Sequence, residues 1–255
     1  MERSLKTPVI DFHTHVGRWG RRGGTDDIDN FVRNMDAAGV DRACVNSIFH
    51  SDARRGNDIV ASFVSRRPDR FIGVAFVTPH YPDEAIRELE RGFDVLGMRY
   101  LKLYPDFFGR PHDDPAYAPI LEWANERGLV LMCHASYRFD DDSVTIPRRY
   151  AALTRRYPHI TWVMAHAGGG LNQEAVDASR IFPNVYLETC GSGTTHGAIE
   201  FGVEHAGADR LLYGSDYVQF DMRGQVGKIV TADIPEDAKR KILGLNAIKL
   251  LGLEA

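Results

Sequence analysis

The sequence predicts an α/β protein, a (β/α)8 barrel built as a single domain over residues 1–255. Short apolar runs rich in β-branched and aromatic residues alternate with amphipathic stretches, which is typical of βαβ units and a parallel sheet. Eight such runs occur, and their starts lie roughly 24 to 35 residues apart, close to the ~30 residues of one βαβ unit. No Gly-x-Gly-x-x-Gly motif follows the first run, which disfavours the alternative of a doubly wound, dinucleotide-binding sheet.

The expected strands are short and mostly apolar, and several of them end on an ionisable residue. The first, PVIDFHTH, ends on His15, and the fifth, LVLMCHA, carries His134 near its end. Runs of this length, bounded by polar or glycine-containing segments, favour strands over helices. The eight strands are expected at 8–15, 43–49, 71–77, 97–104, 129–135, 161–167, 185–191 and 211–217.

Helical patterns fill the intervals between the strands. Ile28, Phe31, Val32 and Met35 fall at spacings of three and four residues, as on one face of a helix. The segment 236–253 repeats this pattern and is expected to form the last helix of the ring.

Composition limits the class of protein. The 255 residues carry a net charge of −4 and are 44% hydrophobic, which favours a globular enzyme over a nucleic-acid or membrane-surface binder. No apolar stretch approaches the roughly 20 residues of a membrane span, and the N-terminus lacks a signal-peptide core. The three cysteines form no Cys-x-x-Cys pair, so a cytoplasmic location is expected. The partner is expected to be a small-molecule substrate, and a homo-oligomer is possible.

Ionisable residues recur at the carboxyl ends of separate expected strands. The active site of such a barrel lies at this end, so the side chains should converge there. Chance would scatter them along the chain. The residues are His13 and His15 on the first strand, Lys102 on the fourth, His134 on the fifth, His166 on the sixth and Asp216 on the eighth.

The His-x-His spacing has a physical reason. Side chains two residues apart on a strand share one face, so Asp11, His13 and His15 are expected to face the barrel axis. Phe12 and Thr14 are then expected to face the helices. Imidazole and carboxylate ligands suit zinc, with manganese and iron as alternatives. The sequence therefore predicts one divalent ion, most simply zinc. His13, His15 and two further residues on later strands are expected to hold it.

His134 and Asp216 are the expected ligands from those later strands. Four protein ligands of this kind leave an open position for a water, whose pKa the ion would lower to give hydroxide near neutral pH. Asp216 is then expected to accept the proton of that water, and His166 to polarise the substrate or to shuttle a proton.

These segments together resemble the amidohydrolase superfamily, specifically its amidohydrolase-related branch. That branch includes 2-pyrone-4,6-dicarboxylate lactonase and aminocarboxymuconate-semialdehyde decarboxylase. The resemblance covers nearly the whole chain. The matching segments are Val9-Ile10-Asp11-Phe12-His13-Thr14-His15, Gly97 to Pro105, His134, Met164-Ala165-His166-Ala167-Gly168-Gly169 and Gly207 to Tyr217.

The resemblance implies the same four metal ligands, and it implies a catalytic role or a second-ion role for His166. Lys102 matches the position where some members carry a carboxylated lysine that bridges two metals. The alternative, preferred here, is one metal with Lys102 binding a substrate carboxylate or pairing with Asp11. Tyr104 and Val218 stand where the branch often has histidine and proline, which leaves the substrate open.

Substrate-binding residues are expected mainly in the loops that follow the strands. The candidates are Lys102, Tyr104, Arg138 and His196. Glu188, near the end of the seventh strand, faces either the pocket or the helices, because the sequence does not fix its register. Cys133 is expected to pack towards the helices as a small hydrophobic residue.

Two reactions fit this set of ligands. The leading prediction is a metal-dependent hydrolase that uses a metal-bound water or hydroxide on a small lactone, amide or ester-like substrate. The alternative is metal-dependent, non-oxidative decarboxylation of a small aromatic or unsaturated carboxylic acid. A barrel that only binds a small molecule would not need an open metal position beside a free histidine and aspartate.

Overall fold

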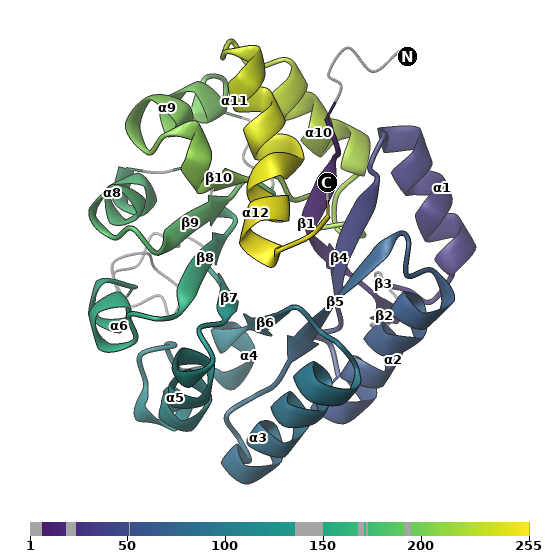
Figure 1. The fold of residues 1–255 in the computed structure, drawn as a ribbon, viewed down its shortest axis with the longest axis vertical. Coiled ribbons are helices and arrows are strands. Elements are labelled where there is room, and N and C mark those ends of the chain that lie inside the picture. The colour runs from purple at the N-terminus through teal and green to yellow at the C-terminus, as the bar shows by residue number, and fades with distance from the viewer. Residues whose placement is uncertain are drawn as a thin grey trace.

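The computed structural model describes residues 7–18, 24–50, 52–135, 150–167, 171, 173–191 and 195–254. Eight parallel strands form one sheet in the order β1-β4-β5-β6-β7-β8-β9-β10, which is nearly the order of the chain (Figure 1). The strands are β1 (Ile10–His15), β4 (Arg42–Asn46), β5 (Phe71–Phe76), β6 (Tyr100–Leu103), β7 (Val130–His134), β8 (Thr161–Ala165), β9 (Val185–Glu188) and β10 (Leu211–Leu212).

The sheet closes on itself through the segment that follows β10. Phe12 N donates to Tyr213 O at 2.9 Å, and Asp216 N donates to His13 O at 2.7 Å. Thr14 pairs in parallel with Tyr217. These bonds join the last strand to the first, so the eight strands form the barrel that the sequence predicts. All eight expected strands are confirmed, and each is shorter than its apolar run.

Helices surround the barrel, as Figure 1 shows. In α1 the Asp27 side chain accepts from Asn30 N, and the helix ends at Gly39, whose φ of 75° suits a residue without Cβ. The helices are α1 (Ile28–Ala38), α2 (Ala53–Arg66), α3 (Pro82–Glu90), α4 (Pro105–Phe108), α5 (Ala118–Glu126), α6 (Tyr150–Arg156), α8 (Gln173–Ile181), α9 (Ala198–His205), α10 (Met222–Val230), α11 (Glu236–Arg240) and α12 (Asn246–Leu251).

Two of the expected helical segments have the predicted pattern. The α1 helix buries the four apolar residues whose spacing indicated it. The expected helix 236–253 is formed by α11, a π-helical turn at Lys241–Leu245 and α12. A small antiparallel pair, β2 (Gly17–Arg18) and β3 (Gly24–Thr25), follows β1. Within the part of the chain described, no helix has both the length and the hydrophobicity needed to cross a bilayer.

The barrel interior is filled by one set of strand residues, and helix α12 contributes Ala247 and Leu251 to it. A separate cluster packs the outer strand faces against the helices and includes Cys133, which confirms the expected position of this residue. The strand residues of the interior are Ile10, Phe12, Cys44, Ile72, Val74, Tyr100, Val130, Met132, Val163, Ala165 and Leu212.

The orientation predicted for Phe12 is wrong. Its ring stacks on Tyr100 at 4.7 Å inside the barrel rather than facing the helices. The pairing of β1 with β4 shifts register between Asp11 and Thr14. Such an irregularity breaks the strict alternation of side chains, so both Phe12 and His13 turn inward.

Asp11 is also placed differently from its prediction. Its carboxylate accepts hydrogen bonds from the backbone amides of His13 and Ser215, at 3.2 and 2.9 Å. Burial raises its pKa to about 7, although these bonds oppose the shift. Asp11 therefore ties β1 to the segment after β10.

Candidate metal centre

Three expected ligands converge at the carboxyl end of the barrel. One Asp216 oxygen lies 2.8 Å from His15 Nε2 and 3.8 Å from His13 Nε2. One donor atom from each residue lies within 4.8 Å of the other two, and all three residues are buried. The first and last strands thus supply a group of nitrogen and oxygen atoms that is compact enough to surround one ion.

His134 and His166 complete the group of imidazoles. His166 Nε2 lies 3.2 Å from His134 Nδ1, and the ring centres are 4.6 Å apart. The His166 ring is also 5.2 Å from the ring of His13. The structure therefore brings together His13, His15, His134, His166 and Asp216, which the sequence predicts as the core of the site.

The backbone at two of these residues is strained. Asp216 has a φ of 57° and His166 a φ of 60°, in the left-handed region that residues with a Cβ rarely adopt. Strain of this kind costs of order 1–3 kcal/mol per residue and clusters at functional sites, where the surrounding structure enforces it. The positions of Asp216 and His166 are therefore imposed by the fold.

Burial lowers the pKa of three of the imidazoles and so favours their neutral form. It lowers the pKa of His13 and of His134 well below the ordinary histidine value, and the neighbouring Lys102 and histidines add to the effect. The pKa of His166 is also lowered, mainly by burial. For Asp216, burial alone would raise the pKa, but the bond with His15 and the neighbouring imidazoles hold it below its ordinary value.

These residues fit a divalent cation. Metal binding requires neutral imidazoles and an ionised carboxylate, the states that the pKa shifts favour. The donors are nitrogen and oxygen atoms, which suit zinc, manganese or iron. His13, His15 and Asp216 form the group that would hold the ion, and His134 is the fourth ligand expected from the sequence.

Lys102 lies against His13 in this group. Its side chain is fully buried, and its Nζ is 3.1 Å from His13 Nε2. Burial lowers the pKa of Lys102, while nearby acidic groups oppose the shift. The pairing of Lys102 with Asp11, one of the alternatives drawn from the sequence, does not occur, because the Asp11 carboxylate bonds to backbone amides.

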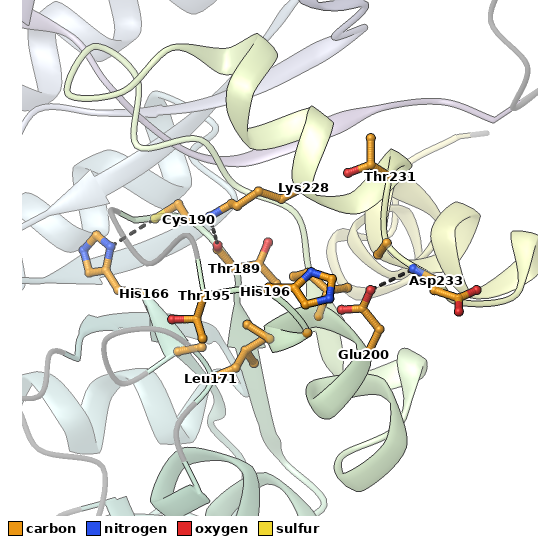
Figure 2. Close-up of a pocket in the computed structure, with 15 residues that line it drawn as sticks. His166, Leu171, Thr189, Cys190, Thr195, His196, Glu200, Lys228, Thr231 and Asp233 are labelled. Carbon is orange, nitrogen blue, oxygen red and sulfur yellow. Dashed lines mark hydrogen bonds between the residues drawn. The ribbon is translucent and has the colours of Figure 1, made fainter.

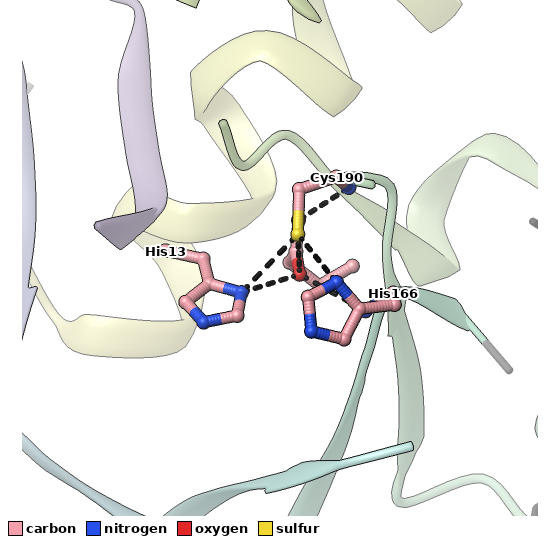
Figure 3. A group of neighbouring side chains, drawn as sticks. His13, His166 and Cys190 are labelled. Carbon is pink, nitrogen blue, oxygen red and sulfur yellow. Dashed lines mark hydrogen bonds and ion pairs between the residues drawn. The ribbon is translucent and has the colours of Figure 1, made fainter. Parts of the chain in front are cut away.

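The sequence left the orientation of Glu188 open and did not indicate Cys190 as a residue of the site. Glu188 points into the barrel, where its Oε2 lies 2.9 Å from His13 Nδ1. Cys190 Sγ lies 3.2 Å from His13 Nδ1 and 3.1 Å from His166 Nδ1. Figure 3 shows the Cys190 side chain pointing toward both rings. Alternation from Tyr186, which packs against the interior cluster, gives the inward register of Glu188 once β9 is placed.

The four expected substrate-binding residues are not all found in one place. Lys102 lies among the ligands, and the Tyr104 ring is 4.4 Å from the ring of His134. His196 is exposed and lines a neighbouring cavity of about 300 Å³, which His166 and Cys190 also line (Figure 2). Arg138 lies outside the described residues.

A parallel eight-stranded barrel with imidazoles and a carboxylate gathered at its strand ends defines a class of metal-dependent barrel enzymes. The chain belongs to the amidohydrolase family, whose family model matches residues 10–253. The resemblance drawn from the sequence is thereby confirmed.

The chain is similar to several decarboxylases along most of its length. It is 25% identical over 236 residues to 2-amino-3-carboxymuconate-6-semialdehyde decarboxylase of Dictyostelium discoideum, a match that covers 78% of this chain and 66% of that relative. It is 23% identical over 279 residues to gamma-resorcylate decarboxylase of Polaromonas sp. strain JS666, covering 89% and 84%. A solved dihydroxybenzoic acid decarboxylase from the same Polaromonas strain, with bound manganese, has a TM-score of 0.77 at 20% identity, covering 96% and 97%.

The leading prediction of a hydrolase is wrong on this finding, because the relatives are named as decarboxylases. The physical reason for the error is that the same ligands serve both reactions, so the metal site alone does not distinguish them. The alternative drawn from the sequence, non-oxidative decarboxylation, is the reading that the relatives favour.

Proposed function

We propose that this protein is a metal-dependent decarboxylase that acts on a small aromatic carboxylic acid. The proposal is supported by the decarboxylase relatives and by one feature of the site itself, a wall of aromatic side chains beside the expected ligands.

The aromatic wall connects two of the expected ligands. The Phe49 ring lies 5.5 Å from the ring of His15 and 5.8 Å from that of Phe107. Tyr104 continues the series, 4.5 Å from Phe107 and 4.4 Å from His134. Aromatic rings at such separations attract one another, and a flat substrate ring gains the same contact. This wall is the observation that favours an aromatic substrate.

The charged groups of the site suit a carboxylate. His13, His15, His134 and Asp216 would hold a divalent ion, which would supply Lewis-acid stabilisation of negative charge on a substrate oxygen. Zinc and manganese both suit these ligands, and manganese is the ion bound in the Polaromonas structure. The buried Lys102 amino group adds N–H donors beside His13, which can bind the substrate carboxylate.

Decarboxylation requires one proton and no oxidant. The bond between the ring carbon and the carboxyl carbon breaks, carbon dioxide leaves, and the electron pair stays on the ring carbon, which then takes a proton. Asp216 and His166 are proposed to hold and deliver this proton, since Asp216 is an expected ligand, His166 contacts His134, and the fold fixes the backbone of both. Water is not a reactant, which distinguishes this reaction from hydrolysis.

The reaction is tested by loading the purified protein with manganese or zinc and supplying ring-hydroxylated benzoates, gamma-resorcylate among them. We expect release of carbon dioxide that depends on the metal, measured by gas analysis and by loss of substrate absorbance. A panel of lactones and amides serves as the comparison. Hydrolysis of those compounds without turnover of any aromatic acid would contradict the proposal.

Replacing Phe107 by alanine tests the aromatic wall. Phe107 is 52% exposed, so its removal should cost the fold little. Loss of one ring contact, worth about 0.5–1.5 kcal/mol, should raise KM about 3- to 10-fold with the metal content unchanged. Tyr81→Ala, at an aromatic residue that is 69% exposed and outside the wall, is the matched control. Equal KM values for the two variants would show that Phe107 does not contact the substrate.

A further inference from the structure

Glu188 is a buried carboxylate at the end of β9 that the proposed reaction does not use. It has no exposed surface, and its two oxygens are surrounded by donors. Cys190 N donates to Oε1 at 2.6 Å, and His166 N donates to Oε2 at 3.2 Å. His13 Nδ1 and the Cys190 thiol also approach Oε2, each at 2.9 Å. A group held by this many contacts is fixed in position.

The contacts of His13 define which ring nitrogen carries the proton. A carboxylate only accepts hydrogen bonds, so His13 Nδ1 must carry a hydrogen to bond Glu188. The lone pair of a neutral imidazole then lies on Nε2, 3.1 Å from Lys102 Nζ, whose N–H can donate to it. Both contacts fit the same tautomer of His13. In that tautomer the lone pair lies on Nε2, the nitrogen that also faces Asp216.

We propose that Glu188 is a positioning residue that holds His13 as a metal ligand. Its carboxylate fixes the ring and the Nδ1–H tautomer, so that Nε2 is already directed towards the ion. Histidine ligands in metal sites commonly donate their second N–H to a carboxylate, which also makes the ligating nitrogen more basic. The inference rests on the metal site of the proposed function and is independent of the substrate.

A competing arrangement uses the same atoms in another way. His13, His166, Glu188 and Cys190 offer one donor atom each within 4.8 Å, so these four could themselves surround an ion. In that arrangement His13 Nδ1 would bind the ion, and it could no longer donate a hydrogen bond to Glu188. The geometry therefore favours the positioning role.

The first test is the metal affinity of Glu188→Gln, measured by competition of manganese and zinc with a chromophoric chelator. Loss of an outer carboxylate of this kind typically weakens metal binding about 10- to 100-fold, and we expect that change with the number of bound ions unchanged. Glu88→Gln is the matched control, because Glu88 is a buried glutamate that bonds Asn57 and Arg91 outside the site. Its affinity should equal that of the wild type even where its thermal stability falls.

Equal affinities in Glu188→Gln and the wild type would overturn the inference and leave the proposed function standing. A wild-type protein that binds no divalent metal would overturn both. A weakened Glu188→Gln variant, combined with a wild type that decarboxylates no aromatic acid, would support the inference while the proposed reaction fails.

Two further measurements use the wild-type chain, so that a folding defect of the variant does not decide the outcome. Nitrogen-15 NMR of histidine-labelled protein should show a protonated Nδ1 at His13, assigned from the signal lost in His13→Gln. A protonated Nε2 instead would overturn the inference. Cobalt-loaded protein should lack a thiolate-to-cobalt charge-transfer band. A band that disappears in Cys190→Ser would make the thiol a ligand and would also overturn it.

Discussion

Asp216→Asn is expected to lower kcat about 100- to 10,000-fold and to weaken metal binding. The carboxylate contributes in two ways, as an oxygen ligand near His13 and His15 and as a group that holds the transferred proton. Asparagine keeps the shape of the side chain but removes both its charge and its ability to carry that proton. The strained backbone at residue 216 is compatible with the change, because asparagine adopts the left-handed region about as readily as aspartate.

The variant is assayed for carbon dioxide release at saturating metal, which separates the chemical step from weakened binding of the ion. Asp221→Asn is the control, because Asp221 caps α10 a few residues away and asparagine caps a helix equally well. We expect the control to retain wild-type activity and thermal stability. A wild-type kcat in Asp216→Asn would show that Asp216 takes no part in the chemical step.

The barrel could be predicted from the sequence because its signal is repeated. Each of the eight strands is an apolar run, and each βαβ unit fixes the direction of the next strand, so an error in one run does not change the fold. The strand ends were less accurate. The last run, 211–217, forms a strand only at Leu211–Leu212, because the segment after it turns to carry Gly214 and Asp216 into the site.

The orientation of side chains in β1 could not be predicted for a different reason. The alternation rule assumes a regular strand, and the register shift between Asp11 and Thr14 breaks it. His13 and His15 face the site as expected, but Phe12 also turns inward and stacks on Tyr100. The residues from Asp11 to Thr14 do not indicate this irregularity, since they include neither glycine nor proline.

Glu188 and Cys190 show the limit of reasoning from ligand types at strand ends. Strand β9 is only four residues long, so its periodicity is too short to fix which face Glu188 occupies. Cys190 lies beyond the strand, and its approach to two imidazoles depends on how the loop after β9 turns. Such contacts between distant segments arise only when the ring has closed.

Gly214→Ala is expected to impair the metal site more than any substitution on the surface. A Cβ at residue 214 would lie 2.7 Å from Glu188 Cδ and 2.9 Å from His13 Cβ, closer than real Cβ contacts. The Glu188 side chain cannot swing aside, because its oxygens are bonded to Cys190 and His13. Relief of the clash must therefore displace either the carboxylate or the imidazole that it holds.

We expect Gly214→Ala to lose at least as much metal affinity as Glu188→Gln, and to lose about 1–3 kcal/mol of stability from overpacking. Gly224→Ala is the matched control, because nothing lies within 4 Å of its added Cβ in helix α10. Alanine there should raise stability by up to about 1 kcal/mol, through its better helix propensity, with metal affinity unchanged. Thermal unfolding and chelator competition measure both quantities on each variant.

The double variant Gly214→Ala with Glu188→Gln decides how the glycine acts. Residues in contact give non-additive effects, whereas independent sites give effects that add. If the added methyl group acts by displacing Glu188, removing the charge of Glu188 in the same chain should cost little more affinity. Additive losses would instead mean that the methyl group acts directly on His13. In either case, residue 214 has no room for a Cβ, because the segment after β10 packs closely against Glu188 and the Cβ of His13.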